Sequence, residues 1–177
     1  MGFRELPALG SDRAAAYNMS RKIVRRGDQL YPTWLECPRM PGAPTLILLA
    51  ACDSETGTVN KAFLLGEGIG NHCGAALALD RTGRLHAVIG AHHGPFLYRA
   101  ADQPDDPASW SAPETLGPAD TYPSLAADAS GALHLAYRER GERWQLGQGR
   151  TWLFGVAPEK QHGILWRREE SGWAKST

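Results

Sequence analysis

Four side chains suited to proton transfer and ion pairing are spaced along the middle of the chain: His72, His92, Tyr122 and Arg138. Imidazole and phenol groups move protons, and a guanidinium binds a carboxylate through two parallel hydrogen bonds. A single histidine in a Gly-rich loop is more often a surface hydrogen-bonding residue than a catalyst. The hypothesis of a catalytic site therefore depends on a fold that brings these four side chains together.

A short internal repeat indicates what that fold is. The segment 80–86 (DRTGRLH) recurs as 128–134 (DASGALH), so that Asp, Gly, Leu and His are each displaced by 48 residues. Small and apolar runs flank both copies, which predicts two short strands joined by a tight turn. The Asp caps the turn, and the Gly supplies a positive φ angle. The repeat itself explains His86 and His134, and we expect both to be structural.

A period of roughly 40 to 50 residues with several short strands per unit is typical of β-propeller blades. We predict an all-β protein with blades of four antiparallel strands, in a single domain over residues 1–177. The approximate blades are 14–66, 67–117 and 118–177. A closed propeller needs about four to eight blades, so we expect about three blades of an incomplete propeller.

The blade pattern gives the four side chains a common place. His72 precedes the first strand of the second blade and His92 follows the next strand, while Tyr122 and Arg138 hold the same places in the third blade. In a propeller the start of the innermost strand and the end of the next one reach the same face, near the central channel. Two adjacent blades would then place the imidazoles beside a phenol and a guanidinium.

Bulk properties exclude several classes of protein. The 19 Lys and Arg residues balance 19 Asp and Glu residues, which argues against a broad nucleic-acid or anionic-membrane surface. Cys37, Cys52 and Cys73 form no disulfide framework. The Gly-rich segment 66–70 precedes no long helical pattern, so we reject nucleotide binding. The N-terminus has no apolar signal segment, so either the protein stays inside the cell or its true N-terminus is missing.

A longer stretch carries a family resemblance. Residues 71–99 (NHCGAALALDRTGRLHAVIGAHHGPFLYR), followed by DDPASW and TYPSLAADASGALHLAYRER, resemble the BNR-4 repeat family of seven-bladed propellers. Within that family they are similar to the propeller-fold ulvan lyases. The resemblance spans about 14–145. It implies that the active-site positions of the lyases fall on His72, His92, Tyr122 and Arg138.

The resemblance also implies a reaction. The substrate would be a uronic-acid-containing, ulvan-like sulfated polysaccharide, cleaved by β-elimination. Arg138 would pair with the uronate carboxylate, His72 and Tyr122 would serve as the acid–base pair, and His92 would position the sugar or share that role. The candidate substrate-binding residues are His93, Asn71 and Arg99. Family members are typically secreted or periplasmic.

No cofactor is required for this chemistry. Cys73 with His72 and His92 or His93 offers the thiol and imidazole ligands that zinc accepts, so a structural zinc ion is conceivable. The ligand spacing typical of zinc sites is nevertheless absent.

Two other functions remain open at this point. A non-catalytic propeller of this family would bind a glycan or a protein. A sialidase-type hydrolase would need an arginine triad and an acidic pair. The S-x-D-x-G-x-T-W box is absent, and the nearest acidic residues, Asp80 and Asp128, cap turns.

Overall fold

The structure is a computed structural model that describes residues 14–15, 21–37, 42–90, 94–139, 163–169 and 172–175. All regular structure in these ranges is β-strand, apart from one turn of 3₁₀ helix, η1 (Gly70–His72). The prediction of an all-β fold is confirmed.

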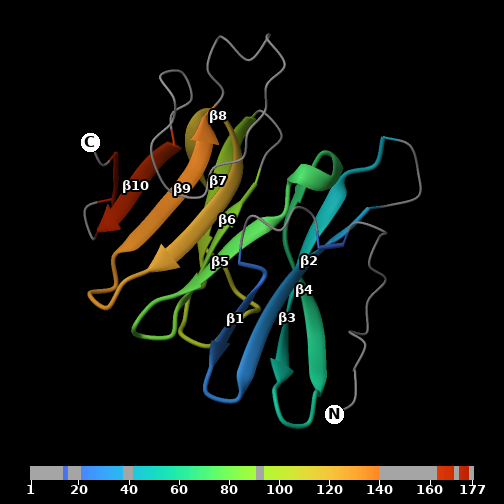
Figure 1. Cartoon of the computed structure of the whole chain (residues 1–177). Coiled ribbons are helices and arrows are strands. Elements are labelled where there is room, and N and C mark those ends of the chain that lie inside the picture. The colour runs from blue at the N-terminus through green and yellow to red at the C-terminus, as the bar shows by residue number, and fades with distance from the viewer. Residues whose placement is uncertain are drawn as a thin grey trace.

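The first sheet has four antiparallel strands in chain order, as one propeller blade requires (Figure 1). These strands are β1 (Ile23–Arg26), β2 (Gln29–Glu36), β3 (Thr45–Asp53) and β4 (Val59–Gly68). The turn between β1 and β2 contains Gly27, whose φ of 56° suits glycine.

The second sheet has seven strands, and β8 belongs to two four-stranded units. The strands are β5 (Ala75–Leu79), β6 (Leu85–Ile89), β7 (Gly94–Ala100), β8 (Glu114–Ala127), β9 (Leu133–Glu139), β10 (Gly163–Glu169) and β11 (Gly172–Lys175). The first part of β8 pairs with β7, and its last part pairs with β9. It is therefore the outer strand of one unit and the inner strand of the next, and the predicted boundary at 117/118 lies inside a continuous strand.

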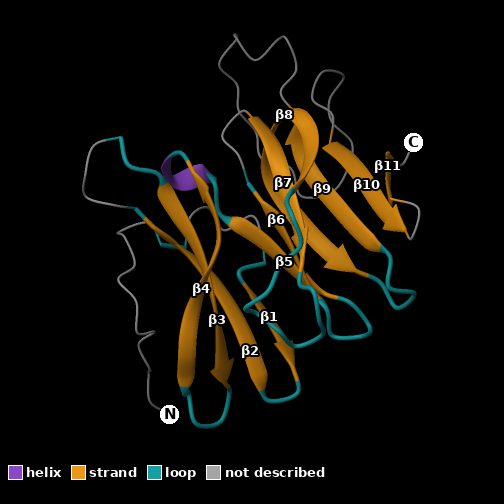
Figure 2. Ribbon diagram, turned by 180° about the vertical axis from the view of Figure 1, so that it is seen from behind, coloured by secondary structure: helices purple, strands orange, loops and turns teal. Residues whose placement is uncertain are grey.

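The unit that begins with β5 lies between two neighbours, as the view from behind shows (Figure 2). One face of β5 and β6 packs against the first sheet through Leu77, Leu85 and Ile89. Their other face contributes Ala76 and Val88 to a second core cluster, which also holds residues of β7, β8 and β9. Burial on both faces explains why AALAL and LHAVI are almost wholly apolar rather than alternating.

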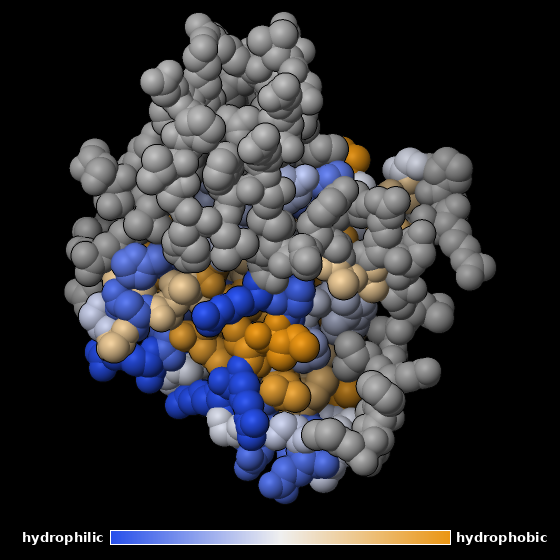
Figure 3. Space-filling model, in the orientation of Figure 1, coloured by the Kyte–Doolittle hydropathy of each residue, from blue (hydrophilic) through white to orange (hydrophobic). Residues whose placement is uncertain are grey.

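The surface over β1 and β5 carries a hydrophobic patch bordered by hydrophilic residues (Figure 3). Ile23 of β1 is 58% exposed. Among the residues that the structure describes, no helix is long and apolar enough to cross a membrane.

Candidate functional site

The structure brings His72 and Tyr122 together. His72 ends η1, just before β5, and Tyr122 lies in β8 where the inner strand of the next unit starts. Their ring centroids are 5.9 Å apart, with the ring planes tilted by 45°. Both side chains are partly exposed. A phenol and an imidazole thus lie side by side at one end of two adjacent inner strands, open to solvent.

An unusual backbone aims the Tyr122 ring. Tyr122 has a φ of 60°, and the register of β8 against β9 shifts between Thr121 and Ser124. A left-handed conformation is uncommon for a bulky residue, and the following Pro123 further restricts Tyr122 toward extended geometry. Such a bulge redirects a side chain that regular alternation would send elsewhere. Tertiary contacts must stabilise it.

Of the other two predicted catalytic residues, the structure describes only the backbone of Arg138. Arg138 lies in β9 with its Cα opposite Thr121, next to Tyr122, while its side chain is outside the described part of the chain. His92 and the predicted substrate-binding residue His93 also lie outside the described residues. Asn71 belongs to η1, and its side chain is not described. These assignments stay predictions.

Arg99, predicted to bind substrate, makes contacts with backbone carbonyls in the structure. Its Nε donates to the carbonyl of Ser111 at 2.9 Å, and its Nη1 donates to the carbonyl of Leu65 at 2.8 Å. A longer contact of 3.4 Å joins Nη2 to the carbonyl of Trp110. Because all three guanidinium nitrogens bind backbone carbonyls, Arg99 ties β7 to β4 of the first sheet. Substrate binding by Arg99 stays a prediction.

A lysine that the sequence analysis missed lies near the start of β5. Lys22 Nζ donates to the carbonyl of Ala75 at 3.2 Å. Burial lowers the pKa of Lys22 to about 8, and the nearby Cys73 offsets part of that effect. Burial also raises the pKa of the Cys73 thiol, which donates to the carbonyl of Gly70 at 3.1 Å. Lys22 comes from a different unit than His72, so no local motif could have indicated it.

The described residues include no group of three or more His, Cys, Asp or Glu side chains that could hold a metal ion. His92 and His93, two of the ligands considered for a structural zinc ion, lie outside those residues. A structural zinc ion is therefore untested.

The opposite end of β5 is a hydrogen-bonded turn. Asp80 Oδ1 accepts from the backbone N–H groups of Thr82 and Arg84 at 2.8 Å and 2.9 Å and from the Thr82 hydroxyl at 2.7 Å. Asp80 Oδ2 lies 3.3 Å from His86 Nε2, and His86 Nδ1 lies 2.8 Å from the Tyr98 hydroxyl. Burial acts to raise the pKa of Asp80, but the hydrogen bonds from Thr82, Arg84 and His86 outweigh it and lower the pKa.

The second copy of the turn repeats the network. Asp128 Oδ1 accepts from the N–H groups of Ser130 and Ala132 and from the Ser130 hydroxyl, and Oδ2 lies 2.8 Å from His134 Nε2. The hydrogen bonds from His134 and then Ser130 hold the pKa of Asp128 well below its usual range. Both repeat histidines thus brace a turn, which agrees with a structural role.

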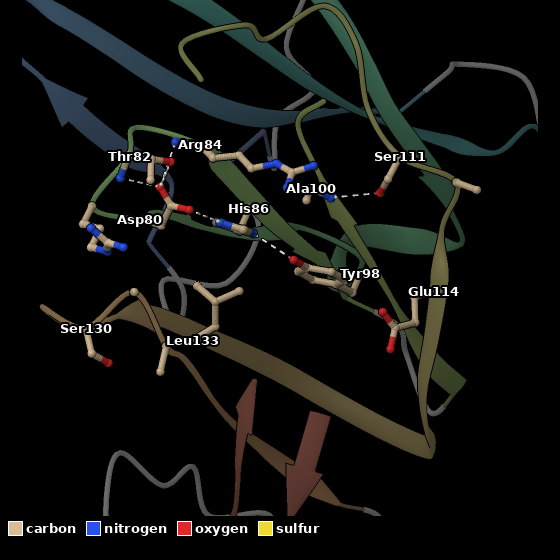
Figure 4. A pocket seen from close by; sticks show the side chains of 14 residues that line it. Asp80, Thr82, Arg84, His86, Tyr98, Ala100, Ser111, Glu114, Ser130 and Leu133 are labelled. Atoms are coloured by element: carbon tan, nitrogen blue, oxygen red, sulfur yellow. Dashed lines mark hydrogen bonds and ion pairs between the residues drawn. The ribbon is translucent and has the colours of Figure 1, made fainter. Parts of the chain in front are cut away.

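A hollow of about 660 Å³ lies between these two turns (Figure 4). Its walls include Arg81, Tyr98, Glu114 and Ser130. Because the hollow lies at the turn end of β5, it is separate from the His72–Tyr122 pair at the other end of the strand.

Comparison with known proteins agrees with the propeller fold. A family model described as "BNR repeat-containing family member" matches residues 53–170. One similar solved structure is a PL25 ulvan lyase, described as a new family of polysaccharide lyase, with a TM-score of 0.66 and 16% identity over 95% of this chain. A second structure of a PL25 ulvan lyase, bound to -[GlcA(1-4)Rha3S]-, has a TM-score of 0.65 and 15% identity over 95% of this chain. The polysaccharide lyase Uly1 has a TM-score of 0.58 and 12% identity over 90% of this chain.

The chain spans 39% of the length of the PL25 structures and 41% of Uly1. At such low identity these likenesses show the fold, which is part of a β-propeller. No curated protein sequence matches the chain.

Proposed function

The chain belongs to the BNR repeat-containing family, and on that premise we propose that it is a polysaccharide lyase that cleaves a uronic-acid-containing polysaccharide by β-elimination. The observation that carries the proposal is the pairing of His72 and Tyr122, with ring centroids 5.9 Å apart at one end of two adjacent inner strands. The ulvan lyases have a similar fold, and one of them is bound to a glucuronate-containing oligosaccharide.

The first step removes the C5 proton of a uronate. That proton is weakly acidic while the neighbouring carboxylate keeps its full charge. Arg138 pairs with the carboxylate and stabilises the enolate-like charge that develops. The backbone of Arg138 lies opposite Thr121, so its side chain starts from a position beside Tyr122.

The second step breaks the glycosidic bond. One member of the His72–Tyr122 pair has taken the C5 proton in the first step, and the electron pair left on C5 now forms the C4=C5 double bond. The C4–O bond breaks, and the other member protonates the departing oxygen. The products are a 4,5-unsaturated uronate and a new chain end. Side chains supply every group this scheme needs, and His92 positions the sugar.

Lys22 adds positive charge near this end of β5, because its ammonium group binds the carbonyl of Ala75, three residues after His72. A cation there favours an anionic polymer over a neutral one. The proposed partner is accordingly an acidic polysaccharide such as ulvan.

The test is to incubate the chain with ulvan and other uronate polymers and to follow the ultraviolet absorbance of the unsaturated product. We expect absorbance to rise with the wild type and to stay flat with His72→Ala and Arg138→Ala. The Arg25→Lys variant serves as a control, since Arg25 is an exposed residue of β1 whose Nη2 lies 3.8 Å from Asp28 Oδ1. A folded wild type that produces no absorbance contradicts the proposal and favours a propeller that binds glycan without cleaving it.

A further inference from the structure

Gly90 lies between the two segments that carry His72 and Tyr122. It directly follows β6, and its N–H donates to the carbonyl of Gly74 at 3.3 Å. A Cβ atom added at Gly90 would lie 2.9 Å from the carbonyl oxygen of His72 and 3.0 Å from that of Gly74. On the other side it would lie 3.4 Å from Cδ of Pro123, the residue after Tyr122.

Two of these three neighbours cannot move without moving the site. The carbonyl oxygens of His72 and Gly74 are backbone atoms of the segment that holds the His72 ring. Contacts near 3 Å between a Cβ and a backbone oxygen require the backbone to shift, and interiors are too closely packed to absorb such a shift at no cost. A side chain at residue 90 would therefore push the His72 segment away from the bulge at Pro123.

In the second copy of the repeat, the position equivalent to Gly90 carries a side chain. At the displacement of 48 residues that relates the two turns, Gly90 corresponds to Arg138. The strand end as such does not demand glycine, because β9 continues through Arg138 to Glu139. The glycine in the first copy reflects what lies against it there.

We propose that Gly90 is a positioning residue: the absence of a side chain allows the His72 segment and the Tyr122 bulge to approach closely enough for their rings to pair. Its effect on catalysis rests on the proposed lyase function, whereas its effect on the ring pair does not. Gly90 touches no substrate in this scheme and acts only through the separation of His72 and Tyr122.

The Gly90→Ala variant tests this in two ways. The nuclear Overhauser effect between the His72 and Tyr122 ring protons should weaken or vanish. Lyase kcat should fall about 100-fold with KM nearly unchanged, as expected when reacting groups are displaced by about an ångström. The matched control is Gly131→Ala at the turn end, where the nearest atom to the added Cβ is Arg81 Nε at 3.6 Å. Its positive φ of 92° makes an alanine there costly for stability, but this variant should keep both the ring contact and kcat.

An unchanged ring contact in folded Gly90→Ala overturns the proposal. Should Gly90→Ala fail to fold, the wild type gives a second test, because the 3.4 Å separation of the Gly90 Cβ position from Pro123 Cδ predicts a nuclear Overhauser effect between the Gly90 Hα and Pro123 Hδ protons. Absence of that effect in the folded wild type overturns the proposal. A wild type with the ring contact but without lyase activity rejects the proposed function alone.

Discussion

The two copies of the repeat are alike at one end of their inner strands and different at the other end. At the turn end, residues 80–86 and 128–134, the same residue types make the same hydrogen bonds in both copies. At the site end, residues 70–74, 90 and 121–123, the same displacement pairs His72 with Asp120, Gly74 with Tyr122 and Gly90 with Arg138. One end is a structural device used twice. The other end combines different residues from two units into one site.

We infer that the turn end mainly determines stability and that the site end mainly determines activity. A turn that closes through its own Asp, Gly and His is a local unit, and each copy needs it to form. A site assembled between two units can vary in each copy, since the strands are already held by the turn end. We therefore expect substitutions at the two ends to affect different measurements.

The sharpest comparison applies one substitution at both ends. Tyr122→Phe removes a proposed acid–base hydroxyl, so kcat should fall about 1000-fold while the unfolding free energy changes little. Tyr98→Phe removes the hydroxyl that lies 2.8 Å from His86 Nδ1, so it should cost about 1 kcal/mol of stability and leave kcat unchanged. Chemical denaturation and the absorbance assay on both variants make the comparison. Equal kcat values for the two variants contradict it.

Lys22 makes the site end sensitive to alkaline pH. Burial lowers its pKa to about 8 from 10.5, so the folded state binds fewer protons than the unfolded state between these values. The contribution of Lys22 to stability should therefore rise with pH from about 8 to about 10.5, by up to about 3 kcal/mol, whereas the raised pKa of the Cys73 thiol acts in the opposite direction. Denaturation curves of the wild type and of Lys22→Met across this range measure the Lys22 contribution as their difference. A rise of the same size in Lys22→Met would assign the effect to another group.

The repeat histidines should differ in the cost of their removal. The side chain of His86 is 9% exposed and lies between Asp80 and Tyr98, whereas that of His134 is 31% exposed. We expect His86→Ala to destabilise the fold by about 3 kcal/mol and His134→Ala by about 1 kcal/mol, because the first leaves more buried polar groups unsatisfied. Thermal unfolding of both variants gives the order, and a reversed order would contradict the comparison.

Substitutions at the two turn glycines should differ less in their effect on stability than substitutions at the two histidines. Gly83 and Gly131 have φ angles of 88° and 92°, so an alanine at either costs about 1 to 2 kcal/mol. At Gly83 the new methyl group would also displace the Arg26 guanidinium, which pairs with Asp105 at 2.6 Å. At Gly131 the nearest atom is Arg81 Nε at 3.6 Å. Gly83→Ala should be the more destabilising by a few tenths of a kcal/mol, as expected for an exposed ion pair, and identical unfolding midpoints would remove the distinction.

Acid should affect the turn end through its two aspartates. Their folded pKa values lie below the usual value, so their contribution is present above about pH 4 and is lost as pH falls toward the folded pKa. The His134 and Ser130 hydrogen bonds lower the pKa of Asp128 the most. Asp128→Asn should therefore reduce the acid dependence of stability more than Asp80→Asn does, as denaturation between pH 2 and about pH 6 would show.

The sequence predicted the turn end well because that end is local. Asp80, Gly83 and His86 lie within seven residues, and their spacing alone implies the turn. The proximity of His72 and Tyr122 was also predictable, since it follows from two copies of the unit placed side by side.

Other features depend on packing between units and could not be predicted from the sequence. The left-handed backbone of Tyr122 breaks local preference, and Gly90 matters because of what lies against it. Lys22 reaches β5 from another unit, and Arg99 binds carbonyls of β4 and of residues 110–111. Strand β8 also continues through the predicted blade boundary.

The site end and the turn end are distinguished most directly by locating where an acidic sugar binds. An uncleaved uronate oligosaccharide would be titrated into Tyr122→Phe while backbone amide resonances are followed by NMR. We expect shifts at His72, Thr121 and Arg138, with none at the hollow lined by Arg81 and Glu114. Shifts confined to that hollow, or no shifts at all, would contradict this expectation.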